Sequence, residues 1–174
     1  MDLFVVNTIL GVIIIILFIL LSWFWPPDSP WAPFWSTPKE KARAFCKLAK
    51  VGKKDVVYEL GCGNATALIV AAKEFGAKGV GIEIDPLRYV IAKISVRLNG
   101  ASSRVTILRK NFFNVDFSPA TIVYAYLVPK ALNRLKPKFK KELKKGTKIV
   151  SYKYEMSQKY VLKDQKSYMF LYKV

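Results

Sequence analysis

The chain has 174 residues, of which 29 are lysine or arginine, 12 are acidic and none is histidine. Its length supports one domain of ordinary size once a membrane segment is set aside. The lack of histidine excludes histidine-based catalysis and the common His-ligated metal sites. Cys46 and Cys62 do not have a metal-binding spacing, so we predict no metal site, and nothing supports a disulfide.

The positive charge is confined to one part of the chain. Of the 12 acidic residues only Asp2 and Asp28 precede Lys39, so the rest carries 29 basic and 10 acidic residues, a net charge of +19. A field of this strength favours an anionic partner, such as a nucleic acid, a membrane surface or an acidic protein. A lysine-rich surface that only solvates the domain explains the same composition.

Residues 3–25 contain no charged side chain and reach the length of roughly 20 residues that a helix needs to cross a bilayer. A cleaved signal peptide is disfavoured, because no basic residue precedes the apolar core and no small-x-small site follows it. Residues 23–25 are aromatic and resemble an interfacial belt. We therefore predict that residues 1–25 form a retained single-pass transmembrane anchor. The basic residues from Lys39 onward place the remainder in the cytoplasm by the positive-inside rule.

Residues 26–37 are rich in proline and tryptophan, which predicts a linker too stiff to be helical. The globular domain is then expected over residues 38–174. Thr37, Pro38 and Glu40 read as the N-cap, first residue and capping-box acid of its first helix.

The central motif lies in residues 56–85. An apolar run that contains Glu59 ends at residue 60, and Gly61, Cys62 and Gly63 follow it. A helix-forming segment over 66–75 leads to a second apolar run over 80–84, which carries Glu83. Strand, glycine loop, helix and strand in this order predict the first βαβ unit of a nucleotide-binding sheet.

The acidic residues distinguish between possible nucleotides. A dinucleotide site favours a third glycine where this chain has Thr66, and Glu59 would place a carboxylate beside the pyrophosphate. S-adenosylmethionine (SAM) has no phosphate and carries two cationic groups, so Glu59 fits it. Glu83, about twenty residues beyond the glycines, is placed to accept both ribose hydroxyls.

The rest of the chain continues the alternation of helices and strands. We expect Asp85 and Pro86 to begin a helix whose buried stripe is Val90, Ile91, Ile94 and Leu98. Further strands are expected over 104–109, 121–127 and 148–154, a helix over 129–143, and a closing hairpin from 160–163 and 168–173. This order predicts an α/β fold, a Rossmann-like seven-strand sheet with a C-terminal antiparallel hairpin.

The motifs E-L-G-C-G-N-A and G-I-E-I-D resemble those of class I, seven-strand, SAM-dependent methyltransferases, with Ala65 where a third glycine is usual. Over residues 33–174 the chain resembles a narrower group. This group contains the small archaeal protein-lysine methyltransferases and the mitochondrial membrane-protein lysine methyltransferases, with a core similar to the non-SET histone lysine methyltransferase. The sequence motifs that carry this resemblance are P-F-W-S-T-P, Y-E-L-G-C-G, G-I-E-I-D, N-F-F-N-V-D, L-K-P-K-F-K-K-E-L and G-T-K-I-V-S.

This resemblance implies SAM as the cofactor and a binding site at the strand ends. The implied residues are Thr37 near the methionyl end, Glu59, Gly61, Cys62 and Gly63 around it, Glu83 on the ribose with Ile84 beside it, and Asn111 and Phe112 on the adenine. Two departures occur. Asn111 is often Asp in the wider core, and residues 64–66 are Asn-Ala-Thr where relatives often have Asp-Gly-Arg.

The resemblance also implies a protein-lysine N-methyltransferase, with a lysine of a membrane protein as the expected substrate. The amine must be neutral to attack, and an apolar aromatic channel disfavours its charged form. Channel candidates are Trp35, Phe113, Tyr126 and Tyr152, with Phe34 and Tyr154 also able to contribute. No residue stands out as a general base, so the expected mechanism is proximity and desolvation with proton loss to water.

Two other classes of function remain open. A nucleic-acid methyltransferase, most simply one acting on RNA, would use the basic surface to hold phosphates, and its binding would weaken steeply with salt. A non-catalytic scaffold with a SAM-binding fold is the other, although the intact acids and glycines of the central motif argue against it.

Overall fold

The computed structural model describes residues 2–24 and 36–174. The chain divides into two units, one N-terminal and one holding the rest, and each is described by itself. Nearly all of the predicted linker over 26–37 lies outside the described residues, as do the channel candidates Phe34 and Trp35.

The N-terminal unit is a helix, α1 (Leu3–Phe24), with no acidic residue in its first turn and no basic residue in its last. Within the described chain it is the one helix long and apolar enough to cross a membrane, over Leu3–Leu20. A signal sequence meets the same criterion, so membrane spanning stays a prediction.

The second unit is built on a seven-stranded sheet in the order β3-β2-β1-β4-β5-β7-β6, which confirms the predicted sheet and its closing hairpin. Strands β1 to β5 are parallel to one another, and β7 is antiparallel to both of its neighbours, β5 and β6. Their bounds are β1 (Val56–Leu60), β2 (Lys78–Glu83), β3 (Val105–Arg109), β4 (Ile122–Ala125), β5 (Lys148–Tyr152), β6 (Leu162–Asp164) and β7 (Met169–Lys173).

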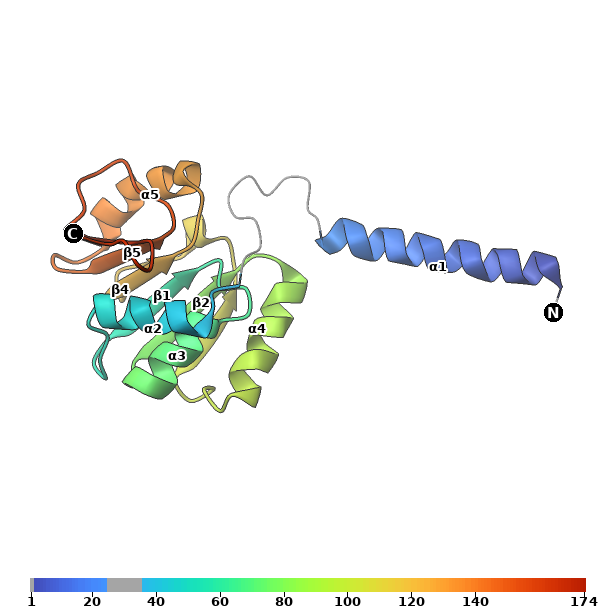
Figure 1. The fold of residues 1–174 in the computed structure, drawn as a ribbon, viewed down its shortest axis with the longest axis horizontal. Helices are drawn as coiled ribbons and strands as arrows, with labels where there is room; N and C mark the ends of the chain where they lie inside the picture. The colour runs from blue at the N-terminus through green and yellow to red at the C-terminus, as the bar shows by residue number, and fades with distance from the viewer. Residues whose placement is uncertain (1, 25–35) are drawn as a thin grey trace. The chain divides into compact units, whose positions relative to one another are not determined.

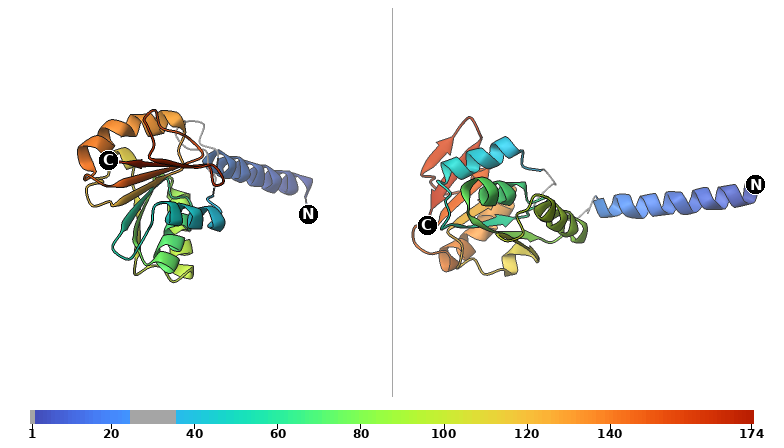
Figure 2. Two further views of the ribbon diagram at one scale, coloured as in Figure 1. Left: turned by 60° about the vertical axis from the view of Figure 1, so that its left-hand side comes forward. Right: turned by 90° about the horizontal axis from the view of Figure 1, so that it is seen from below.

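Helices cover both faces of this sheet (Figures 1 and 2). On one face lie α2 (Lys39–Leu48), α3 (Thr66–Phe75) and α4 (Pro86–Leu98), and on the other lies α5 (Pro129–Glu142). Only a single 3-10 turn, η1 (Phe112–Asn114), stands between β3 and β4. Asp85 caps α4 as predicted, because its carboxylate accepts a hydrogen bond of 2.8 Å from the Arg88 backbone N–H.

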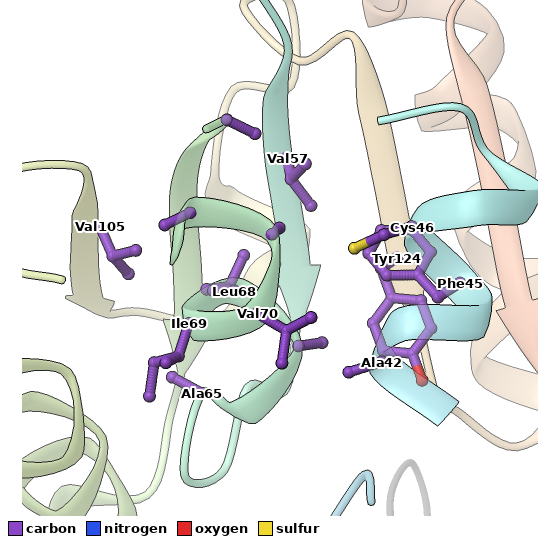
Figure 3. Close-up of a cluster of buried hydrophobic side chains, with 14 of the residues drawn as sticks. Ala42, Phe45, Cys46, Val57, Ala65, Leu68, Ile69, Val70, Val105 and Tyr124 are labelled. Carbon is purple, nitrogen blue, oxygen red and sulfur yellow. The ribbon is translucent and has the colours of Figure 1, made fainter. Parts of the chain in front are cut away.

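The core forms two hydrophobic clusters, one on each face of the sheet. The central strand β4 serves both, because Tyr124 belongs to the cluster under α2 and α3 while Val123 and Ala125 belong to the cluster under α5. Figure 3 shows Tyr124 against Phe45 of α2, with ring centroids 4.4 Å apart. Burial on both faces explains why residues 122–125 are apolar throughout.

Strand β2 lies so close to α3 that a side chain would not fit at its centre. A Cβ at Gly81 would lie 2.7 Å from Ile107, 2.8 Å from the Cys62 sulfur and 2.9 Å from Leu68. Gly81 therefore lets the glycine loop and α3 pack directly on β2. This requirement was not evident in the sequence, where Gly81 is simply a glycine within an apolar run.

The predicted start of the first helix was wrong by one residue. Pro38, not Thr37, occupies the N-cap position of α2, and no side chain makes a capping hydrogen bond there. The Thr37 hydroxyl instead lies 3.3 Å from the Tyr124 hydroxyl. The Thr37 side chain thus makes a tertiary contact with Tyr124 instead of the capping hydrogen bond that the local sequence pattern predicted.

The predicted buried stripe of α4 was also wrong. Val90, Ile91, Ile94 and Leu98 are exposed, by 48, 41, 53 and 81% respectively. The helix instead buries its smaller side chains, Ala92 and Val96, with Tyr89 partly buried beside them. Because small residues allow α4 to approach the sheet closely, they occupy the inward face and the larger aliphatic ones point outward.

We expect Gly81→Ala to destabilise the domain by about 1–3 kcal/mol, because the new methyl group would overpack a filled core. Denaturant unfolding of residues 31–174 measures this. Gly52→Ala is the matched control, since a Cβ at Gly52 meets only an Asp55 carboxylate oxygen at 3.9 Å. Equal stability of Gly81→Ala and wild type would show that α3 can move away from β2.

Candidate active site

The buried acidic residues Glu59 and Glu83 lie near the carboxyl ends of neighbouring parallel strands, β1 and β2. Strand β1 pairs with β2 on one side and with β4 on the other, while the chain runs from β1 through β2 to β3 before crossing to β4. This reversal of strand order is a topological switch point, where open α/β sheets bind ligands. Glu59 and Glu83 lie near the carboxyl ends of β1 and β2, and the glycine loop, Ile84 and Asn111 follow strands β1, β2 and β3, so the fold brings these predicted site residues to one edge.

The loop after β1 has the backbone of a glycine turn. Gly61 and Gly63 have φ angles of 70° and 55°, and Ala65 adopts a left-handed φ of 60°. Ala65 therefore holds a left-handed backbone conformation that usually favours glycine, at a cost of roughly 1–2 kcal/mol. The backbone N–H groups of Gly61 and Cys62 both donate to the Ile82 carbonyl, at 2.8 and 3.0 Å.

Glu83 holds this loop against the end of β2. One carboxylate oxygen accepts a hydrogen bond from the Gly63 N–H at 3.0 Å and the other accepts one from the Asp85 N–H at 3.1 Å. The side chain is only 5% exposed. The carboxylate thus has fixed orientation, and a carboxylate retains further lone pairs for a ligand.

Glu59 is a buried carboxyl group that lacks a full set of partners. Its Oε2 atom is buried without a hydrogen bond. Burial raises the pKa of Glu59 well above its ordinary value, the nearby Glu83 charge raises it further, and a hydrogen bond from the Leu68 N–H acts in the opposite direction. An unpaired buried acid is costly, and a cationic ligand group beside it would relieve that cost. The residues present therefore fit SAM.

The segment before α2 is tied to the same edge. The Asn64 amide donates to the Ser36 hydroxyl at 2.9 Å, and the neighbouring Thr37 is buried against Tyr124. Burial raises the pKa of Tyr124 well above its ordinary value, and the hydrogen bond with Thr37 acts in the opposite direction. Smaller electrostatic effects of Glu59, Tyr152 and Tyr126 raise the pKa further. Sequence reasoning treated Tyr124 only as part of a buried strand, although a tyrosine there signals a hydroxyl that needs a partner.

Ile84, Asn111 and Phe112 follow the ends of β2 and β3. Ile84 is 59% exposed, and Phe112 packs on Phe113 with ring centroids 4.7 Å apart. The Asn111 side-chain oxygen, Oδ1, accepts a hydrogen bond from the Phe113 backbone N–H at 3.0 Å. This part of the edge offers an apolar surface beside an amide.

Three of the described channel candidates, Tyr126, Tyr152 and Tyr154, form a second aromatic group. The ring of Tyr126, which follows β4, lies 4.6 Å from that of Tyr152 and 6.3 Å from that of Tyr154. Phe113 instead packs under the Arg134 guanidinium, 4.7 Å from its ring centroid. Burial, and then the neighbouring Tyr126, raise the pKa of Tyr152 above its ordinary value of 10.0, while Lys153 acts in the opposite direction.

Neither cysteine is a nucleophile. Burial raises the pKa of Cys46 to about 12. Burial also raises the pKa of Cys62 well above its ordinary value, and the charges of Glu59 and Glu83 add to the effect. The reactive form of cysteine is the thiolate, so both side chains serve packing, and Cys62 can offer a ligand only its backbone.

Comparison with known proteins identifies relatives of this architecture. The sequence profile of the ANTKMT methyltransferase domain matches residues 59–161. A protein-lysine N-methyltransferase of Saccharolobus islandicus (strain REY15A) is 42% identical over 128 residues, which cover 73% of this chain and 80% of the relative. A ribosomal protein L11 methyltransferase of Clostridium botulinum (strain Alaska E43) is 35% identical over 121 residues, covering 68% of this chain and 38% of that protein.

A solved structure extends the comparison to the fold. It is an RNA methyltransferase from Salinibacter ruber in complex with S-adenosyl-L-homocysteine, with a TM-score of 0.76 and 32% sequence identity. The match covers 82% of this chain and 93% of the other, so that protein consists almost entirely of the fold described here.

We expect Glu59→Gln to change how stability depends on pH in the ligand-free protein. Because the pKa of Glu59 is raised in the folded state, its contribution is fully present below its ordinary value of 4.5 and is lost as pH rises through the folded pKa. The glutamine variant lacks this loss, so its melting temperature should rise relative to wild type between pH 4.5 and 8.

The control is Glu74→Gln. A hydrogen bond from Arg43 lowers the pKa of Glu74, so its contribution is fully present above its ordinary value of 4.5 and is lost only as pH falls below it. Between pH 4.5 and 8 the melting temperature of Glu74→Gln should therefore differ from that of wild type by a constant amount. A constant difference for Glu59→Gln as well would mean that burial does not destabilise the ionised Glu59 side chain.

Proposed function

This chain belongs to the ANTKMT methyltransferase domain family and is a SAM-dependent methyltransferase, and on that premise we propose that it methylates lysine side chains of proteins while anchored to a membrane. The observation that carries the choice of lysine is the Saccharolobus relative, whose name states that activity and whose alignment with this chain covers most of both proteins. The aromatic group at the carboxyl edge supports it, because it suits an amine that must lose its charge.

We propose that SAM lies across the switch point, with its ribose hydroxyls on Glu83 and its cationic methionyl end near Glu59 and Thr37. Gly61, Cys62 and Gly63 would face it through their backbone. Ile84 and Phe112 would pack on the adenine. Since Oδ1 of Asn111 already accepts the Phe113 N–H, we assign the side-chain amide nitrogen, Nδ2, as the donor to an adenine ring nitrogen.

When bound, SAM supplies a methyl group attached to a positively charged sulfur. The proposed part of the protein in the reaction is to hold a neutral lysine amine in line with that methyl. Tyr126, Tyr152 and Tyr154 would surround the aliphatic stem and lower the amine pKa by desolvation. Their hydroxyls are not needed as bases, since the proton of the methylated amine can leave to water.

The anchoring rests on α1. We propose that residues 1–25 span the membrane, that residues 26–37 link the span to the domain over 38–174, and that the domain lies in the cytoplasm. Residues 25–35 separate the described helix from the described domain, and an extended chain of that length reaches at most about 40 Å. Lysines of membrane proteins close to the headgroups would then be at high effective concentration.

RNA methylation is the second candidate. It is favoured by the net charge of +19 from Lys39 onward and by the Salinibacter structure, which is described as an RNA methyltransferase. The same protein can be tested for both activities.

The test is transfer of label from radioactive SAM by the full-length purified protein into membrane and cytosolic extracts, each treated with nuclease or with protease. We expect the labelled product in membranes to survive nuclease, to be lost with protease, and to contain methyl-lysine. Tyr152→Ala should lower the rate by on the order of tenfold or more through lost positioning, while SAM affinity stays within about twofold. Label that is lost with nuclease would establish RNA methylation instead.

We expect Glu83→Ala to weaken SAM binding by about 1.5–3 kcal/mol, since charge-assisted hydrogen bonds to the ribose are lost. Isothermal titration calorimetry measures it. Glu74→Ala is the control, because Glu74 sits near the far end of α3 and pairs with Arg43 on the surface. Unchanged affinity in Glu83→Ala would remove Glu83 from the site.

A further inference from the structure

The outward face of α4 is aliphatic at its centre. At about 100° per residue, Val90, Ile94 and Leu98 fall on one side of the helix, opposite the buried Ala92 and Val96. A solvent-facing helix surface normally carries polar residues at its centre. This face has no partner within the described domain, since α4 packs inward on β2 and β3.

The residues that border the face are basic. Lys93 and Arg97 are exposed along one side of the stripe, and the helix PLRYVIAKISVRL contains no acidic residue. A helix with an apolar face edged by lysine and arginine is typical of helices that lie in a membrane interface. An acidic protein surface would match the basic edge, but it would not account for a central row of aliphatic side chains.

We propose that the outward face of α4 docks on the headgroup region of a bilayer that contains anionic lipid. The proposal rests on the membrane anchoring by α1 proposed above, because a tether of at most about 40 Å keeps the domain next to the lipid. Val90, Ile94 and Leu98 enter the interface, and Lys93 and Arg97 contact lipid phosphates. The charge of the domain adds a longer-range attraction of the same sign.

This docking would orient the active site. In a parallel βα unit the helix lies alongside its strand, so α4 lying flat on the bilayer places the parallel strands roughly parallel to the membrane plane. The carboxyl edge, with Glu59 and Glu83, then opens sideways along the surface. A lysine in a segment that emerges from the membrane reaches the site from that direction.

The first experiment uses residues 31–174, which hold the whole sheet and both hydrophobic clusters and match a solved chain that is almost entirely this fold. We expect it to cosediment with phosphatidylcholine vesicles that contain phosphatidylglycerol, and much less with phosphatidylcholine alone. Ile94→Gln with Leu98→Gln should reduce binding at least tenfold. Lys93→Gln with Arg97→Gln should reduce it about fivefold for each charge removed.

The matched control is Val161→Gln with Leu162→Gln, which removes two side chains of similar exposure, 65% and 50%, at β6. It should bind vesicles like wild type. SAM binding by each variant establishes that the domain is folded and tests the proposed function separately, so a protein that binds SAM but not vesicles overturns this inference alone. Vesicle binding equal in the α4 variants and wild type also overturns it.

A second experiment uses the full chain in nanodiscs of the two lipid compositions, with hydrogen exchange as the readout. We expect slower exchange of α4 in anionic discs, and its loss in Ile94→Gln with Leu98→Gln. Light scattering of residues 31–174 tests the competing occupant, a second copy of the chain. A dimer that the α4 variants dissociate would make this face a protein interface and would overturn lipid docking.

Discussion

The site depends on one buried carboxylate. Glu83 accepts one hydrogen bond from the loop after β1 and another from the residue that starts α4. The loop can lie this close to β2 because its glycines take left-handed backbone angles and because Gly81 has no side chain. The same two contacts therefore fix the switch point, the start of α4 and the direction of the carboxylate, all before any ligand binds. Such preorganisation is what a SAM-dependent transfer requires, since its catalysis is mainly positioning.

The sequence predicted the sheet and the glycine loop because these depend on local patterns. Two acids at strand ends, two glycines and alternating apolar runs specify a βαβ unit without any knowledge of distant contacts. The errors came where a distant contact decides. Thr37 has the pattern of an N-cap, but Tyr124, 87 positions away, takes its hydroxyl. Two sets of apolar side chains on α4 could face the sheet. The prediction chose the more hydrophobic set, which contains Ile94 and Leu98, whereas close packing on the sheet selects the smaller side chains of Ala92 and Val96.

Two facts limit the chemistry of the site: the chain contains no histidine, and burial raises the pKa values of its cysteines and of Tyr152. Both thiols are held protonated, and the pKa of Tyr152 is raised above an already high ordinary value of 10.0. On the proposed function, side chains at the carboxyl edge supply shape, desolvation and negative charge, and the proton of the amine leaves to water. Selection of one nucleophile over another would then depend on the aromatic group around Tyr126 and on the proposed membrane anchoring.

The position of β7 has a consequence for biosynthesis. Residues 169–173 form a strand that inserts between β5 and β6, and β5 pairs with it along its whole length. The sheet cannot close until these residues have left the ribosome, whereas α1 emerges first. On the membrane anchoring proposed above, a partly made chain would display its apolar helix to the targeting machinery while the domain is still unfolded. Delivery to the membrane would then precede completion of the sheet on which the cofactor site is built.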